Sequence, residues 1–415
     1  MTRAAIGPDE SAPQVQDQRQ DGTSVCVVGP GTRFLSGITY YTFGLVSALA
    51  PHHRVSAILL RRLLPRRLYP GRERVGADLT ALQLPAYVPA AGRVDWYWGP
   101  GMWEAIRLLL RQRPQVMVLQ WWSGAVLHTY LLLALVARWL GVSLVVEFHE
   151  VLDTGEDRLG WVRRYVDLLG PRLWHAASAF VVHNQHDRNL VVRRHHIDQQ
   201  LTVLIPHPGY DHLQASRGET QSGPVRLLFF GVVRPFKGVE DLITAFGLVA
   251  RTRPGDFQLT VIGETWEGWT QPEELIARCP ERQWIRRVAR YVTDAEAEAA
   301  FGAADVVVLP YRRCSSSGPL HIAMAMGLPV VATRVGGIPE ATASYPGAVL
   351  AEPADPESLA RAILAAAQLR GRRFTGAPSW QETASKYSAL FQAVLAGSVP
   401  DLEGSRGGHE DGAGS

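Results

Sequence analysis

The chain has 415 residues, which is too long for one ordinary hydrophobic core and predicts two globular domains of roughly 100 to 200 residues each. Its hydrophobic fraction of 47% and charged fraction of 20% are typical of a globular protein with buried cores, and they exclude a disordered or fibrous chain. The formal net charge of +3 is too small for a general nucleic-acid binder, which needs a strong basic field.

The two ends of the chain are poor in apolar residues. Residues 1–22 have no basic start followed by an apolar run, so we expect a disordered tail and no signal peptide. Residues 398–415 predict a second disordered tail. The three cysteines are scattered and form no CxxC pair, which favours a reducing cytoplasm.

Residues 23–205 carry short apolar segments that alternate with helical stretches. This alternation predicts a parallel α/β sheet, and we interpret 23–205 as a Rossmann-like domain. The predicted strands are SVCVVG, RVSAILL, VMVLQ, SLVVEF, AFVVHN and LTVLIP. Polar residues and a glycine interrupt the apolar stretch 124–146, so we expect a helix near 125–139 and then a strand, not a membrane span.

A basic run at residues 59–74 includes Arg61, Arg62, Arg66 and Arg67. One interpretation is a solvated surface segment, which we prefer because Pro65 interrupts any amphipathic helix. The other is a grip on an anionic membrane surface or a phosphorylated acceptor, which would place the protein at the inner face of the membrane.

The segment 206–224 is rich in glycine, proline and polar residues, and we interpret it as an interdomain linker. A second strand series then predicts another Rossmann-like domain at 225–375. Its strands are VRLLFFG, QLTVIG, ADVVVLP, PVVAT and AVLAEP. A final helix within 376–397 is expected to pack back on the first domain.

Each strand series opens with a strand that runs into a glycine-containing turn. The first turn, GPGTRFLSG at 29–37, has Phe34 where a dinucleotide fingerprint needs its third glycine, which disfavours a nicotinamide or flavin cofactor. The second, GVVRPFKG at 231–238, places Arg234 and Lys237 just before a helix. Two cations beside a helix N-terminus suit a diphosphate, although solvated loop charges remain the alternative.

A third element follows the strand ADVVVLP. Ser315, Ser316, Ser317 and Gly318 can expose backbone amides at the start of a helix, where Pro319 suits the first turn. Such a start favours anion binding. The alternative is an ordinary capped helix, since the following AMAM also suits a core-facing helix.

These motifs together resemble the family 4 glycosyltransferases, which have the two-domain GT-B fold. The resemblance extends over residues 24–395. It rests on SGITYYT, QWW at 120–122, FHE at 148–150, RPFKG, YVTD at 291–294 and AMAMGLPVVATRVGGIPE. It implies two Rossmann-like domains that face each other and bind a nucleotide-sugar donor and an acceptor.

The resemblance also implies roles for particular residues. Arg234 and Lys237 would hold the donor diphosphate and neutralise the leaving group, and His149 would lie near the reacting sugar. Glu150, Trp121 and Trp122 would lie on the acceptor side, although a structural His149 and core tryptophans remain alternatives. The implied donor-binding residues are Gly37, Ser315, Ser316, Ser317, Gly318, Leu320, Tyr291 and Val292.

The chain departs from the family at two positions. The family carries two glutamates eight positions apart around this helix start, and here those positions are Cys314 and Ile322. Ile322 cannot form a hydrogen bond with a ribose, and Cys314 is a poor acceptor for sugar hydroxyls. How the chain compensates for the missing glutamates is left open by the sequence.

We therefore expect a bacterial glycosyltransferase that retains anomeric configuration, without a metal or other cofactor. The donor would be a nucleotide-diphosphate sugar of the UDP or GDP type. The acceptor would be a glycan, a lipid-linked glycan or a small natural product. The alternatives are a non-catalytic GT-B subunit and another nucleotide-sugar enzyme of the same fold, such as an epimerase.

Overall fold

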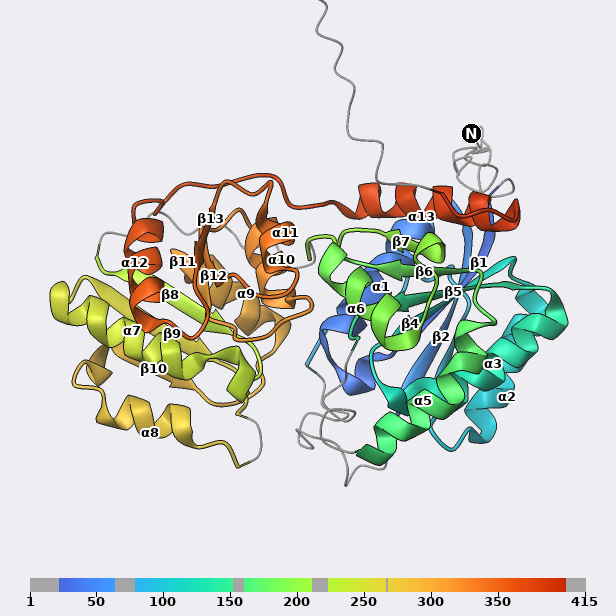
Figure 1. Ribbon diagram of the computed structural model, residues 1–415, viewed down its shortest axis with the longest axis horizontal. Coiled ribbons are helices and arrows are strands. Elements are labelled where there is room, and N and C mark those ends of the chain that lie inside the picture. The colour runs from blue at the N-terminus through green and yellow to red at the C-terminus, as the bar shows by residue number, and fades with distance from the viewer. Residues whose placement is uncertain (1–21, 64–78, 152–159, 211–222, 266–267, 401–415) are drawn as a thin grey trace, which may run out of the picture.

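The computed structural model describes residues 22–63, 79–151, 160–210, 223–265 and 268–400, which form two α/β domains side by side (Figure 1). Every strand pairs in parallel with its neighbours, and most strands are buried. Long apolar strands buried on both faces are typical of parallel sheets covered by helices. In the part of the chain that the structure describes, no helix combines the length and apolar character needed to cross a bilayer.

The N-terminal domain is built on a seven-stranded sheet with the order β3-β2-β1-β4-β5-β6-β7. Its strands are β1 Ser24–Pro30, β2 Arg54–Arg62, β3 Ala90–Asp95, β4 Val116–Trp121, β5 Ser143–Phe148, β6 Ala179–Val182 and β7 Thr202–Leu204. Its helices are α1 Gly37–Leu49, α2 Gly99–Gln112, α3 Leu127–Leu140, α5 Gly160–Trp174 and α6 Gln185–His195. Short 3-10 helices lie at Thr32–Phe34, Gly124–Val126 and Gln199–Leu201.

Two hydrophobic cores cover the two faces of this sheet. One lies under α2, α3 and α5, and the other lies under α1. The apolar stretch 124–146 forms a helical segment and then β5, as expected, because Gly141 adopts a left-handed conformation (φ +69°) that ends α3.

The C-terminal domain is built on a six-stranded sheet with the order β10-β9-β8-β11-β12-β13. Its strands are β8 Val225–Phe230, β9 Phe257–Ile262, β10 Ile285–Val288, β11 Val306–Leu309, β12 Val330–Thr333 and β13 Ala348–Ala351. Its helices are α7 Val239–Thr252, α8 Gln271–Arg278, α9 Asp294–Ala303, α10 Gly318–Ala325, α11 Ile338–Thr342 and α12 Pro356–Ala367. Short 3-10 helices lie at Pro235–Lys237 and Arg282–Trp284.

The last helix, α13 Trp380–Leu395, returns to the N-terminal domain and packs on α1 (Figure 1). Gly44 allows the close approach, since a Cβ there would lie 2.2 Å from the Trp380 ring. Tyr387, Leu390 and Phe391 of α13 join the core beneath α1. The chain therefore crosses between the domains twice, once between β7 and β8 and once before α13.

Candidate functional site

The loop after β8 carries Lys237 and packs tightly against the loop after β11. Gly238 adopts a left-handed conformation (φ +62°), and a Cβ there would lie 2.0 Å from the carbonyl oxygen of Pro310. The amide of Arg312 donates to the carbonyl oxygen of Phe236 over 2.8 Å. Two loops that are distant in sequence therefore form one surface at the carboxyl edge of the C-terminal sheet.

The two basic side chains of this loop lie near one aromatic ring. The Arg234 guanidinium carbon lies 5.8 Å from the centre of the Phe236 ring, and the Lys237 ammonium lies 5.7 Å from it. The Lys237 ammonium also lies 3.7 Å from the centre of the buried Tyr311 ring. Aromatic faces attract cations, so these rings hold both charges in place.

Lys237 keeps its charge despite its half-buried position. Burial would lower the pKa of its ammonium, but Tyr311 and Cys314 act in the opposite direction, and the pKa is raised overall. Glu150 of the N-terminal domain also raises the pKa of Lys237, so it lies within electrostatic reach across the domain boundary. The site therefore presents a cation to the space between the domains.

Helix α10 begins beside this cation. The Ser317 hydroxyl accepts from the Leu320 amide over 3.3 Å and donates to the Tyr311 hydroxyl over 3.2 Å. The hydroxyl of Ser317 and the amide of Leu320 therefore serve the helix cap. Gly318 lies at the first position of the helix and has a backbone amide, whereas Pro319 has no amide hydrogen.

The two serines before the cap interact with their surroundings. The Ser315 carbonyl oxygen accepts from the Asn184 side chain over 3.3 Å, a contact between the domains. The Ser316 hydroxyl lies 3.4 Å from Nε2 of His321.

The two residues that replace the family's glutamates are both buried. Cys314 donates to the Ser316 carbonyl oxygen over 3.1 Å, and burial raises its thiol pKa to about 11. Ile322 packs in the core of the C-terminal domain. The thiol is therefore neutral near pH 7, and neither residue supplies the negative oxygen of a glutamate.

Tyr210 lies beside both of the glycines that are expected to bind the donor. Its hydroxyl donates to the Gly37 carbonyl oxygen over 3.0 Å. A Cβ on Gly37 would lie 3.5 Å from that hydroxyl, and a Cβ on Gly318 would lie 3.6 Å from the Tyr210 ring. The start of α1 and the start of α10 therefore border the same tyrosine from opposite domains.

Tyr291 and Val292 lie between β10 and α9, where the domains also meet. Val292 is buried and Tyr291 is half-buried. Asp294, two residues further on, accepts from the hydroxyls of Tyr40 and Thr80 of the N-terminal domain. This loop is therefore tied to the opposite domain.

The expected acceptor-side residues divide into two groups. Glu150 is exposed and follows β5. Trp121 and Trp122 lie in the N-terminal core, where the Trp121 ring packs 4.9 Å from that of Trp174, so neither is placed to bind an acceptor. Trp121 pairs in register with Phe148, and its ring points to the sheet face that α5 covers.

The basic run after β2 is described only at its start. Arg61 is hydrogen-bonded to the buried Asp95, and Arg62 lies 4.0 Å from the same carboxylate. Both arginines therefore contribute to the structure of the β2–β3 edge. Arg66 and Arg67 lie outside the described residues.

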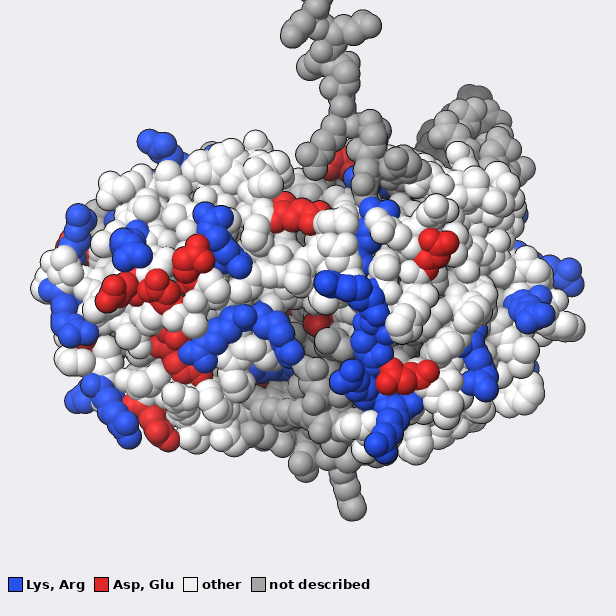
Figure 2. Space-filling model, viewed as in Figure 1, with Lys and Arg blue, Asp and Glu red and all other residues white. Residues whose placement is uncertain are grey.

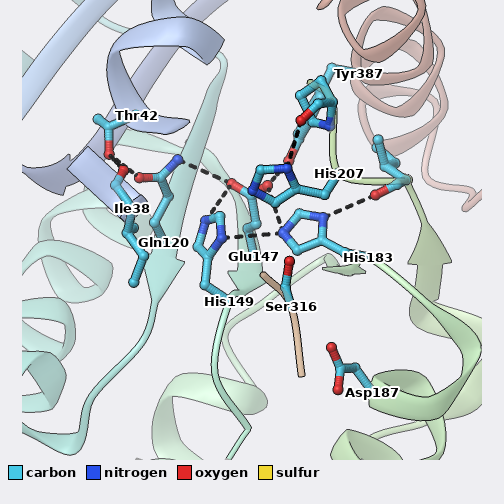
Figure 3. A network of polar contacts seen from close by, with 12 residues as sticks. Ile38, Thr42, Gln120, Glu147, His149, His183, Asp187, His207, Ser316 and Tyr387 are labelled. Carbon is cyan, nitrogen blue, oxygen red and sulfur yellow. Dashed lines mark hydrogen bonds and ion pairs between the residues drawn. The ribbon is translucent and has the colours of Figure 1, made fainter. Parts of the chain in front are cut away.

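A buried polar network surrounds His149 (Figure 3). His149 follows β5, and its Nδ1 lies 3.3 Å from Nε2 of His183, which follows β6. The Glu147 carboxylate lies 3.6 Å from Nε2 of His149 and 3.7 Å from Nε2 of His183. Glu147 also accepts from Tyr387 of α13 over 2.5 Å and from Gln120 over 3.2 Å.

The network sets the charge of its buried groups. Burial would raise the pKa of Glu147, but His149, His183 and the Tyr387 hydrogen bond lower it to about 2. Burial lowers the pKa of His183 to about 4, and its Nδ1 donates to the Ile205 carbonyl oxygen over 3.0 Å. At neutral pH Glu147 is therefore a carboxylate, and neutral His183 can accept through Nε2.

The histidines continue across the domain boundary. His207, which follows β7, stacks on His321 of α10 with ring centres 4.2 Å apart. Burial lowers the pKa of His207, and burial lowers that of His321 to about 3. Both rings are therefore neutral at physiological pH, which allows them to stack without charge repulsion.

Three of these side chains have the donor set of a metal site. Ligand atoms of Glu147, His149 and His183 all lie within 4.8 Å of one another. Two imidazoles and a carboxylate suit zinc or iron. Gln120 and Tyr387 each donate to one oxygen of the carboxylate, which leaves lone pairs on both oxygens.

From the sequence alone, Glu147, His183, His207 and His321 are not predicted to form one cluster. A signal was present, because His149, His183 and His207 each follow one of three successive strands. In a parallel sheet those ends meet at one edge. The role of Tyr387 had no comparable signal, since it depends on where α13 returns.

Comparison with known proteins agrees with the arrangement of the two domains. Residues 36–208 match the model described as "Glycosyl transferase 4-like domain", and residues 224–368 match "Glycosyl transferases group 1". The chain is 30% identical over 242 residues to a D-inositol 3-phosphate glycosyltransferase of Segniliparus rotundus, which covers 53% of each chain. The chain thus spans about half the length of this curated relative.

Solved structures resemble nearly the whole chain. Anabaena HepE in complex with UDP has a TM-score of 0.58 at 15% identity, covering 90% of this chain and 97% of that one. The catalytic domain of Arabidopsis thaliana starch synthase IV, bound to ADP and acarbose, has a TM-score of 0.64 at 14% identity, covering 90% and 100%. At these identities the likeness concerns the fold alone, and it confirms the expected GT-B architecture.

Proposed function

We propose that this chain, which belongs to the family 4 glycosyltransferases, transfers a sugar from a nucleotide-diphosphate sugar to a hydroxyl-bearing acceptor. The observation that carries the proposal is the position of Lys237. Its ammonium lies against the Tyr311 ring, and Tyr311 is hydrogen-bonded to the serine that caps α10. A fixed cation beside a helix N-terminus suits a diphosphate.

Catalysis would rest on stabilising the departing diphosphate. As the bond to the sugar breaks, negative charge grows on the leaving phosphate oxygens. Lys237 and Arg234 would neutralise it, and the Gly318 amide would donate to it. The exposed Gly37 would let the start of α1 approach from the other domain. Charge stabilisation of this kind is worth about 3 kcal/mol or more for a single donor.

His149 would lie beside the reacting sugar and orient it. Its ring is fixed by the Tyr41 ring, whose centre lies 4.5 Å away, and by the hydrogen bond with His183. We propose that the anomeric configuration is retained, as in the family that the sequence resembles. Ser315 and Ser316 would contact sugar hydroxyls in place of the carboxylates that Cys314 and Ile322 lack.

Tyr291 and Val292 would border the nucleobase of a UDP- or GDP-sugar. Glu150 would face the acceptor, which we propose to be a glycan, a lipid-linked glycan or a small natural product. We place the reaction in the bacterial cytoplasm, where nucleotide sugars are the usual donors.

We propose that transfer needs no resident metal or cofactor. Lys237 and Arg234 supply the positive charge that a metal would otherwise bring to the diphosphate. Extensive dialysis against a chelator should leave turnover unchanged. Loss of turnover on dialysis, restored by one divalent cation, would contradict this and would direct attention to the Glu147, His149 and His183 cluster.

The proposal is tested by measuring nucleoside diphosphate release from a panel of nucleotide sugars. The pure protein should consume at least one donor, and Lys237→Ala should abolish most of that turnover. Lys386→Ala is the matched control, because Lys386 is the other lysine of the chain and lies in α13. Near-normal turnover of Lys237→Ala would refute the diphosphate assignment.

The second candidate is a non-catalytic subunit that binds a nucleotide or a partner. It is favoured by one observation, the burial of Cys314 and Ile322 where the family keeps its glutamates. Binding of a nucleotide sugar without hydrolysis or transfer would support it. Product analysis also identifies an epimerase, which would change the sugar and leave it attached to the nucleotide.

A further inference from the structure

Three helices form the outer layer of the N-terminal domain on one face of its sheet. Helices α2, α3 and α5 lie side by side in Figure 1, and α3 packs against both of the others. Their inner sides bury residues such as Leu109, Leu133 and Leu173 in a shared core. Their outer sides therefore point away from the sheet, to the same side of the domain.

These outer sides carry large apolar side chains that are mostly exposed to solvent. Trp139 is 75% exposed, Trp103 is 71% exposed and Trp161 is 67% exposed. Leu135 and Leu168 are exposed to 65% and 71%. Single exposed apolar residues are ordinary, but a concentration of them on one layer marks an interaction surface.

Arginines accompany the apolar side chains at helical spacing. On α2 the exposed stripe reads Trp103, Arg107, Leu110 and Arg111. On α3 it reads Leu135, Arg138 and Trp139, and on α5 it reads Trp161, Arg164, Leu168 and Arg172. Residues three or four apart lie on one side of a helix, so each helix presents both kinds of side chain outward.

The layer has few acidic groups to balance these arginines. Among the described residues of the three helices the acids are Glu104 and Asp167, and each is within ion-pair distance of an arginine outside them, Arg93 or Arg194. Figure 2 shows blue side chains separated by white surface over the region where Figure 1 places α3 and α5. The layer is therefore both apolar and cationic.

We propose that this layer binds the surface of a bilayer that contains anionic phospholipid. Tryptophan and leucine enter the boundary between headgroups and acyl chains, and arginines bind the lipid phosphates. Charge complementarity favours this partner over a second copy of the chain, because a symmetric contact would bring two cationic layers together. The proposal concerns a different surface from the basic run after β2, and it does not depend on glycosyl transfer.

The test is co-sedimentation of the full chain with extruded vesicles. One set contains phosphatidylcholine with phosphatidylglycerol, and the other contains phosphatidylcholine alone. We expect binding to the anionic set, weakened by added salt, and at least tenfold weaker binding to the neutral set. Absence of binding to anionic vesicles, or equal binding to both sets, would overturn the proposal.

Variants assign the binding to this layer. The tryptophan variant combines Trp103→Ser, Trp139→Ser and Trp161→Ser. The arginine variant combines Arg107→Gln, Arg138→Gln and Arg164→Gln. The control variant changes three exposed arginines of the C-terminal domain, Arg253→Gln, Arg361→Gln and Arg372→Gln. The first two should each lose binding at least tenfold while the control retains it, and equal binding by all four proteins would refute the assignment.

Sedimentation velocity without vesicles tests whether the layer instead binds a second copy of the chain. If the layer joined two copies, the wild type would be a dimer that the tryptophan variant dissociates, and this result would contradict a membrane surface. We expect the oligomeric state to be the same in the wild type and the tryptophan variant. Unchanged far-ultraviolet circular dichroism in each variant confirms that the substitutions on exposed positions leave the fold intact.

Discussion

The hydrogen bond between Tyr387 and Glu147 ties the last helix to the sheet of the N-terminal domain. Tyr387→Phe removes the hydroxyl that donates to this buried carboxylate over 2.5 Å and leaves the ring in the core. Glu147 keeps the hydrogen bond from Gln120. Because a hydrogen bond to a charged group contributes roughly 1.5–3 kcal/mol, we expect a loss of about 2–3 kcal/mol in the free energy of unfolding.

The control is the same substitution at a neutral acceptor in the same domain. Tyr130 is buried, and its hydroxyl donates to the Gln120 carbonyl oxygen over 2.6 Å. Tyr130→Phe should therefore cost only about 0.5–1.5 kcal/mol.

Urea unfolding, followed by far-ultraviolet circular dichroism, gives both free energies, and hydrogen exchange reports on the amides of α13. We expect Tyr387→Phe to be the less stable of the two variants and to exchange faster along α13. If Tyr387→Phe is no less stable than Tyr130→Phe and α13 exchanges at its original rate, the carboxylate does not anchor the helix.

Two further predictions concern the loop after β8 and the histidines. Gly238→Ala should reduce stability and donor turnover more than Gly141→Ala. Both glycines have a left-handed φ, but of the two only a Cβ at 238 would meet the Pro310 carbonyl oxygen, at 2.0 Å. Equal effects of the two substitutions in unfolding and turnover assays would contradict this. The folded pKa of His183, about 4, lies below its ordinary 6.5, so the unfolded state gains protons first and stability falls by about 3 kcal/mol as the pH drops from about 6.5 to 4. Urea unfolding at a series of pH values tests this. His183→Gln should reduce the loss of stability between about pH 6.5 and 4, and the exposed control His52→Gln should not. An equal slope of stability against pH in both variants would contradict the prediction. Glu147, with a folded pKa of about 2 against an ordinary 4.5, should add a further loss between about pH 4.5 and 2.

The strands that the sequence predicts are those with a continuous apolar run, and they include the edge strands β7 and β13. The sequence does not predict β3 and β10, each of which lies at one edge of its sheet. Their sequences, AAGRVD and IRRV, carry arginines and give no continuous apolar run. A strand with few apolar side chains is fixed by its partner strand and by the neighbouring helix more than by its own sequence, so local patterning gives a weak signal.

The hypothesis of a diphosphate site rests on glycine and charge that lie in one motif. Lys237, Gly238 and Ser317 lie in the loops that follow β8 and β11, and their chemistry can be inferred from the motif alone. Trp121 could not be assigned in this way, since its environment depends on whether a helix covers that side of β4. The partnership of Glu147 with Tyr387 joins residues 240 positions apart, which a single sequence does not specify.

The central claim is that Lys237 binds the diphosphate of the donor. Calorimetric titration of the wild type and Lys237→Ala, each with a nucleoside diphosphate and with the corresponding nucleoside, tests it most directly. We predict that the substitution weakens diphosphate binding by about 10- to 150-fold, as expected for a charged hydrogen bond of roughly 1.5–3 kcal/mol, and leaves nucleoside binding unchanged. Equal weakening of both ligands, or no change for the diphosphate, would contradict the claim.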